Sequence, residues 1–139
     1  MDTKPTDSQF DALADAARSV QNKVGEQNLW KAVMALPSWY FVAKGTGEEA
    51  EPMVAAVEGR PNLLAFTSEE RAEAFTRHLE AKKGGPRAGV LEMNTPDAVA
   101  YAQQLGEANV DSVLFNNGQY SFTTSMLKLR DMYGRYAKR

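Results

Sequence analysis

The chain has 139 residues and a formal net charge of −2, a length that suits one domain built around one hydrophobic core. Its slightly acidic balance argues against general binding to nucleic acids or membrane surfaces, since both attractions need a basic excess concentrated on one surface. With no cysteine and a single histidine, His78, disulfides, thiolate zinc sites and thiol nucleophiles are excluded, and a histidine-based metal site or catalytic triad would depend on one residue.

The first part of the chain is predicted to be helical. Residues 1–7 are polar and are expected to be disordered. Ser8 or Asp7 can cap a first helix, whose apolar side chains recur at helical spacing until Gly25 stops it. A second helix is expected over 26–36 and ends before a proline, because the residue before proline is pushed out of the α region.

Three strands follow, over 39–44, 52–57 and 62–66, because these runs are rich in aromatic, β-branched and other apolar residues. The connections between them are short, which favours an antiparallel meander.

The clearest pattern in the chain is the helix after the third strand. Thr67 is expected to cap this helix, and Glu70 completes a T-x-x-E capping box. Apolar side chains then recur at helical spacing until the glycines and proline at 84–86 end the helix.

The rest of the chain is predicted to alternate strands with helices: a strand over 88–93, a helix capped by Thr95 that runs to about Gly106, a strand over 111–115, an extended piece at 120–122, and a last helix capped by Thr123 or Thr124. Strand–helix–strand order implies right-handed crossovers and locally parallel pairing. We therefore predict an α/β fold of mixed α+β character, in which residues 1–139 form a single domain with a mixed sheet of about five strands and helices packed on it.

Two further signals bear on location. No apolar run approaches the roughly 20 residues of a transmembrane helix, and the start of the chain has neither the basic nor the apolar segment of a signal peptide. We therefore expect a cytoplasmic protein that makes no membrane contact and has neither a structural metal nor a bound cofactor.

Three segments, taken in order, carry a family resemblance: WYFVAKG at 39–45 followed by a Gly/Glu loop and PMVAAVEGRPNLLAF, LLAFTSEERAEAF at 63–75, and VDSVLFNNG at 110–118. From about Leu29 onward the chain resembles the N-terminal domain of the enhanced-serine-sensitivity (SseB-like) proteins of bacteria. Asn117 stands where that family usually has proline. The resemblance implies a small α/β domain without an established enzymatic activity.

Trp39, Tyr40 and Phe41 lie in the densest aromatic part of the chain. Strand alternation places Trp39 and Phe41 on one face and Tyr40 on the other. Core packing is the simplest interpretation, whereas aromatic side chains on an outer face would form the partner-binding surface.

Two polar segments are candidate binding sites. Asn116, Asn117 and Gly118 follow a predicted strand, and loops on rigid scaffolds often bind ligands or partners, although turn chemistry alone also explains them. Thr67 and Ser68 lie at a helix N-terminus, where free amides can hold an anion. The glutamates that follow them would repel a phosphate, and helix capping accounts for both residues.

The C-terminal segment carries a basic tail, formed by Lys128, Arg130, Arg135, Lys138 and Arg139. Such residues complement the dipole of the last helix, or they meet an acidic partner; nucleic acid is the least expected partner. The acidic loop formed by Glu48, Glu49 and Glu51 of a second copy is another candidate for this contact, which would give a homodimer.

The leading hypothesis is a non-enzymatic protein-interaction module whose partner is another protein or a second copy. The alternative is a sensor that binds a small molecule or an anion at Thr67–Ser68 and Asn116–Gly118. An enzyme is the least favoured class, because His78 and the acid pair Glu69 and Glu73 are explained by a solvated helix face.

Overall fold

The computed structural model describes residues 6–18, 23–45, 47–84, 88–118 and 120–136. Within these ranges the elements are the helices α1 (Asp7–Ala17), α2 (Lys23–Ala35), α3 (Glu69–Lys83), α4 (Thr95–Glu107) and α5 (Met126–Tyr136), the 3₁₀ turn η1 (Gly47–Glu49), and the strands β1 (Ser38–Lys44), β2 (Glu51–Pro52), β3 (Val54–Val57), β4 (Arg60–Ala65), β5 (Val90–Asn94), β6 (Ser112–Phe115) and β7 (Phe122–Ser125).

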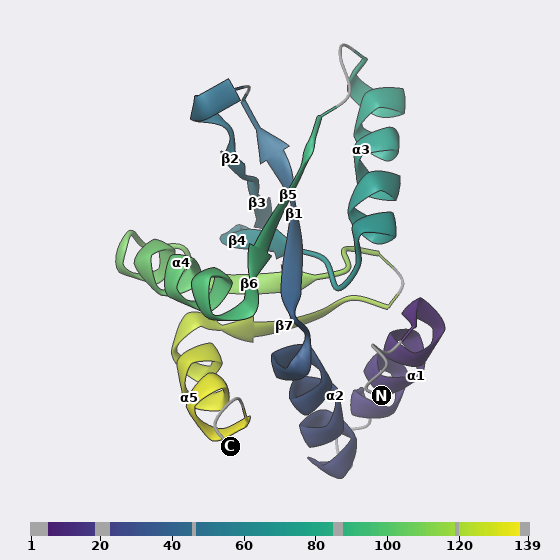
Figure 1. The fold of residues 1–139 in the computed structure, drawn as a ribbon, viewed down its shortest axis with the longest axis vertical. Helices are drawn as coiled ribbons and strands as arrows, with labels where there is room; N and C mark the ends of the chain where they lie inside the picture. Colours follow the sequence, from purple (N-terminus) through teal and green to yellow (C-terminus); the bar gives the residue numbers. More distant parts are fainter. Residues whose placement is uncertain (1–5, 19–22, 46, 85–87, 119, 137–139) are drawn as a thin grey trace.

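The strands form two sheets (Figure 1). The smaller sheet has the order β2-β1-β5 and is antiparallel, and the larger has the order β3-β4-β6-β7, in which β4 and β6 run parallel while the other pairs are antiparallel. An isolated antiparallel bridge between Tyr40 and Phe66 joins β1 to the residue after β4. The two sheets are therefore hydrogen-bonded to one another and do not pack as separate layers.

Helices cover both faces of the smaller sheet, with α3 on one face of β1 and β5 and α4 on the other. Trp39 and Phe41 point to the α4 side and belong to the main core, which also contains apolar residues of α1, α2, α5 and the larger sheet. Val42 points to the α3 side and packs in a second cluster with Phe66 and Ala72. Alternation along β1 thus supplies both clusters from one strand.

Phe115 lies at the centre of the main core. Its ring is 4.9 Å from that of Trp39 and 5.9 Å from that of Trp30, both edge to face, and 5.2 Å from the stacked ring of Phe122. Such aromatic contacts add to the area that the rings bury. The indole N–H of Trp39 donates to the Val33 carbonyl at 3.4 Å, which gives this buried polar group a partner.

The predicted α/β fold is confirmed, but its sheet is divided differently. In place of one mixed sheet there are two sheets, of three and four strands. The predicted locally parallel crossovers around β5 are wrong, because β5 pairs antiparallel with β1 and the parallel pair is β4 with β6. The physical reason is that β3 and β6 already occupy both edges of β4, so the strand after α3 cannot pair with β4, and it pairs with the open edge of β1.

Several predicted helix boundaries are corrected at the N-terminal end of the chain. Residues 1–5 lie outside the described ranges, and Thr6 caps α1 through a reciprocal pair of hydrogen bonds with Gln9, in place of Ser8 or Asp7. This first helix ends at Ala17, and Gly25 is a buried residue of α2 and does not act as a stop.

The predicted caps of the later helices are also corrected. Ser68 caps α3 in place of Thr67, and Asn94 caps α4. The hydroxyl of Thr95 instead donates to the Leu36 carbonyl. Thr123 and Thr124 belong to β7, which spans 122–125 in place of the predicted 120–122, and α5 starts after them.

Candidate functional site

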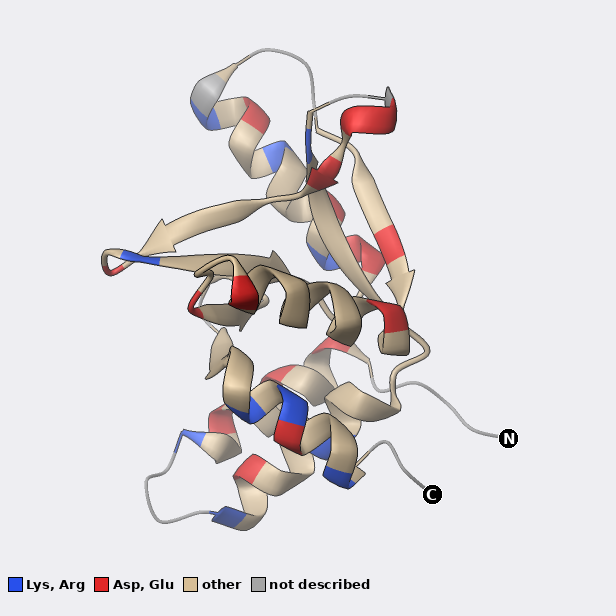
Figure 2. Ribbon diagram, turned by 90° about the vertical axis from the view of Figure 1, so that its left-hand side faces the viewer, with Lys and Arg blue, Asp and Glu red and all other residues tan. Residues whose placement is uncertain are grey.

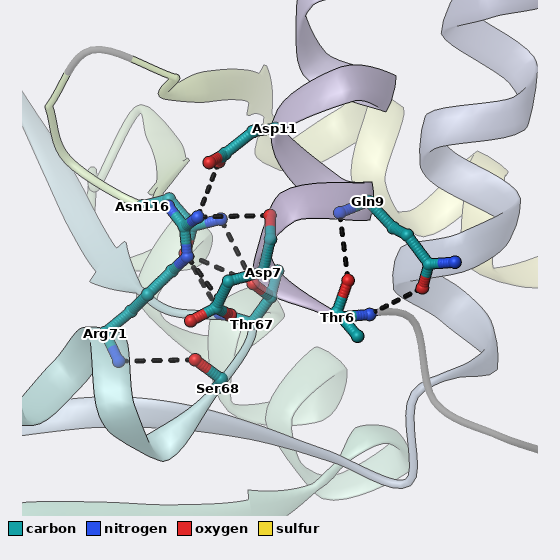
Figure 3. A network of polar contacts seen from close by, with 8 residues as sticks. All are labelled: Thr6, Asp7, Gln9, Asp11, Thr67, Ser68, Arg71 and Asn116. Carbon is teal, nitrogen blue, oxygen red and sulfur yellow. Dashed lines mark hydrogen bonds and ion pairs between the residues drawn. The ribbon is translucent and has the colours of Figure 1, made fainter.

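The carboxyl ends of the parallel strands β4 and β6 bring together two segments that the sequence singled out. Ala65 pairs with Phe115 at the end of this ladder, so the residues that follow lie side by side. Asn116 Oδ1 accepts the backbone N–H of Thr67 at 3.0 Å, and Asn116 Nδ2 donates to Thr67 Oγ1 at 3.1 Å (Figure 3). Both side chains are buried, and this pair locks the start of α3 to the end of β6.

These contacts remove most of the predicted anion site. Thr67 and Asn116 satisfy one another, and the hydroxyl of Ser68 accepts the backbone N–H of Arg71 at 3.2 Å as the helix cap. An anion at this position would compete with those bonds. It would also meet Glu69 and Glu70, the acidic first turn of α3.

Arg71 carries the nearest positive charge, but this charge is already paired. Its Nη2 donates to Asp11 Oδ1 at 2.5 Å and to the Asp7 carbonyl at 3.2 Å, while its Nε lies 3.2 Å from Asp7 Oδ1 (Figure 3). The Arg71 side chain is 20% exposed, so water screens these contacts only in part. The ion pairs connect α1 to α3, and no local sequence pattern predicts them.

A depression of about 400 Å³ opens beside this junction. Its walls combine aromatic rings with polar edges and are formed by Phe66, Arg71, Ala74, Phe75, His78, Asn116, Asn117 and Gly118. Asn117 and Gly118 are exposed here, unlike Asn116. The structure therefore places the predicted turn and the predicted α3 histidine around one hollow.

His78 itself is exposed on α3, and its ring is 6.3 Å from that of Phe75. Among the described residues no group of three or more histidine, aspartate and glutamate side chains is arranged to hold a metal ion.

The prediction of an aromatic partner-binding surface at the start of β1 is wrong for two of its three residues, because they are buried. Trp39 and Phe41 are 0% exposed, because their side of β1 faces the main core, and neither can touch a partner in this fold. Tyr40 points the other way and is half-buried, as alternation predicted. Only Tyr40 of the three remains available at the surface.

One carboxylate contacts Tyr40, and two more act on it electrostatically. Its hydroxyl lies 3.5 Å from Glu92 Oε2, and Glu92 is also its cross-strand partner in β5. Burial, then the carboxylate of Glu92 and those of Glu69 and Glu70, raise the pKa of the Tyr40 hydroxyl above its usual value of about 10. We call these four residues the Tyr40 face. Glu92 is its unexpected member, since only the register between β1 and β5 reveals the neighbourhood.

The basic tail occupies a different part of the molecule. Lys128, Arg130 and Arg135 are exposed on α5, and Lys138 and Arg139 lie outside the described residues. Lys128 and Arg135 border a second depression, of about 480 Å³, whose wall also contains two acids, Glu26 and Asp131. This hollow has mixed charge and no basic excess. In Figure 2 acidic positions mark η1, the start of β2 and the middle of β5, on the half of the molecule away from α5.

A scan against protein-family models and a search of curated proteins found no match to this chain. No helix in the described part of the chain is long and apolar enough to cross a bilayer.

Replacing Asn116 by alanine should destabilise the fold. The substitution leaves the buried Thr67 N–H without an acceptor, which costs about 1–3 kcal/mol, and it keeps a positive φ of 55° without the polar side chain that tolerates it. Asn117→Ala, one residue on and exposed, is the matched control and should change the free energy of unfolding by less than about 0.5 kcal/mol. Urea titration followed by circular dichroism measures both. Equal stability of the two variants would contradict the role given to Asn116.

Tyr40 should make the fold sensitive to alkali. The pKa of Tyr40 is raised in the folded state. The contribution of Tyr40 to the free energy of unfolding is therefore fully present below about pH 10 and is lost as the pH rises through the folded pKa. The free energy of unfolding should therefore fall less steeply above pH 10 in Tyr40→Phe than in the parent chain. In an alkaline titration followed by absorbance at 295 nm, Tyr40→Phe should have one fewer tyrosine that ionises at high pH than the parent chain. Tyr101, whose pKa burial also raises, should still ionise at high pH in both. An unchanged titration curve would contradict this environment for Tyr40.

Proposed function

We propose that this chain is a non-enzymatic protein-interaction module of the bacterial cytoplasm, related to the N-terminal domain of the SseB-like proteins, and that it contacts its partner through the Tyr40 face. One observation carries the proposal. A half-buried tyrosine lies among three carboxylates on β5 and the start of α3, and no described basic side chain forms an ion pair with any of the three.

The chemistry of this face favours a basic protein partner. Tyrosine supplies contact area with a polar end and loses little rotamer freedom when it is bound, which is why it is enriched at interfaces. Unpaired surface carboxylates attract a positively charged surface and speed its association. The same arrangement repels nucleic acids and anionic membranes.

Support for a binding role over catalysis comes from the carboxyl ends of β4 and β6. Open α/β sheets often place their chemistry at such ends. Here the polar groups that gather there, Thr67, Asn116 and Arg71, are engaged with one another or with α1. They are better explained as contacts that hold β6, α3 and α1 together.

Two matched variants should distinguish binding through the Tyr40 face from a general effect of charge. Glu92→Lys changes the centre of the face, whereas Glu107→Lys makes the same change of charge on an exposed residue at the far end of α4, about 20 Å of helix away. We expect a stoichiometric partner to be captured from the native lysate by the parent chain and by Glu107→Lys, and lost with Glu92→Lys. Equal retention by both variants would overturn the assignment of the face.

A second candidate function is favoured by the depression that Phe75, His78, Asn117 and Gly118 border. Its ring walls and exposed amide suit a small planar ligand. A metabolite present at a hundredfold excess over its dissociation constant should stabilise the fold by about 2.7 kcal/mol, visible as a rise in Tm. Loss of that rise in Asn117→Ala would place the ligand in the depression, and no rise with any member of a broad metabolite panel would reject this candidate.

A further inference from the structure

The strand β5 has one edge that pairs with no described strand. It is the last strand of the β2-β1-β5 sheet, and in Figure 2 no strand lies beyond the side of it that faces away from β1. An edge strand presents backbone N–H and C=O groups that another strand can use.

The register identifies which residues of β5 face outward. Flanking the ladder, Ala43 N–H donates to the Gly89 carbonyl at 2.8 Å, and Thr95 N–H donates to the Pro37 carbonyl at 3.1 Å. Hydrogen-bonded pairs alternate along an antiparallel ladder. Within β5 the residues bonded to β1 are therefore Leu91 and Met93.

The residues between them, Val90 and Glu92, direct their backbone groups away from β1. An independent contact on the opposite edge agrees: Tyr40, which pairs with Glu92, exchanges both of its backbone hydrogen bonds with Phe66, at 3.0 and 2.8 Å. No described residue forms a hydrogen bond with the backbone of Val90 or Glu92 outside the helices and ladders. Four main-chain groups are thus available at regular strand spacing.

Charge selects what can bind to this edge. A strand that hydrogen-bonds to Glu92 places its opposing side chain on the same face as Glu92 and Tyr40. That face also carries the field of Glu69 and Glu70. Lysine or arginine at the opposing position is attracted by the carboxylate of Glu92, whereas an acidic residue is repelled.

The same geometry disfavours a second copy. Antiparallel pairing of two β5 strands about their centres would place Glu92 opposite Glu92, and directly opposed like charges destabilise a strand pair. Charged residues on edge strands commonly prevent self-association in this way.

We propose that the β5 edge accepts an extended, basic segment of a partner protein, which adds a fourth strand to the β2-β1-β5 sheet and sets a lysine or arginine opposite Glu92. This inference rests on the proposed function and specifies its partner. Main-chain hydrogen bonds to Val90 and Glu92 supply affinity, and the Tyr40 face supplies selectivity.

The test uses the full chain and synthetic peptides that alternate arginine with valine, at up to about 1 mM, so that weak binding is detected. One peptide has glutamate at each arginine position. Two others carry N-methyl groups on alternate amides and so block one hydrogen-bonding edge of the peptide or the other. Binding is followed by ¹H–¹⁵N NMR shifts at low salt.

We expect the basic peptide to shift the amides of Val90 and Glu92, its glutamate counterpart to bind about tenfold more weakly, and only one of the two N-methylated peptides to lose binding. Glu92→Lys should reverse the preference between the basic and acidic peptides, and Glu107→Lys should preserve it. Salt should weaken binding of the basic peptide to the parent chain.

Other results overturn the inference. Absence of shifts, shifts remote from β5, or equal binding of both N-methylated peptides would exclude strand addition, and a dimer in sedimentation that Glu92→Lys alters would make a second copy the occupant. These failures are distinguishable from failure of the proposed function. A native partner that is still lost with Glu92→Lys would leave the Tyr40 face in place without strand addition.

Discussion

The backbone bridge between Tyr40 and Phe66 couples the two sheets of this fold. Its two hydrogen bonds, at 3.0 and 2.8 Å, join the smaller sheet to the larger one. They also fix the direction in which Tyr40 presents its backbone, and through the ladder they determine that Val90 and Glu92 face outward. The burial of Trp39 and Phe41 and the partial exposure of Tyr40 follow from the same alternation.

A second set of contacts explains why the carboxyl ends of β4 and β6 are structural. Asn116 holds Thr67, and Arg71 holds Asp7 and Asp11. Together they connect β6, α3 and α1, three elements that are far apart in the sequence. Buried polar groups of this kind are costly to leave unpaired, so their first role is to specify how the elements meet. The surface that we propose for a partner lies elsewhere, around Tyr40 and Glu92.

Local sequence signals located the elements well, because the 2.0 and 3.6 residue periods are set by each segment itself. The alternation of Trp39, Tyr40 and Phe41 was predicted correctly for this reason. Helix caps were harder, since Thr67 and Ser68 are both good caps by composition. The choice between them is made by Asn116, which lies 49 positions away in the sequence and draws Thr67 inward.

Long-range pairing could not be predicted from the pattern. A strand followed by a helix and a strand suggests a parallel neighbour, but both edges of β4 are occupied and β5 pairs with β1. The position of Glu92 beside Tyr40 follows only from the register between β1 and β5, which also turns the backbone groups of Glu92 away from β1. In the sequence it is one acid in a short apolar run.

Amide hydrogen exchange in the free protein tests this central geometry most directly. Leu91 and Met93 donate within the ladder to β1, so their amides should be protected, whereas those of Val90 and Glu92 should exchange quickly with solvent. We expect NMR to resolve this alternation residue by residue. Slow exchange at Val90 and Glu92 with fast exchange at Leu91 and Met93 would contradict it, because the outward edge of β5 would then be the inward one.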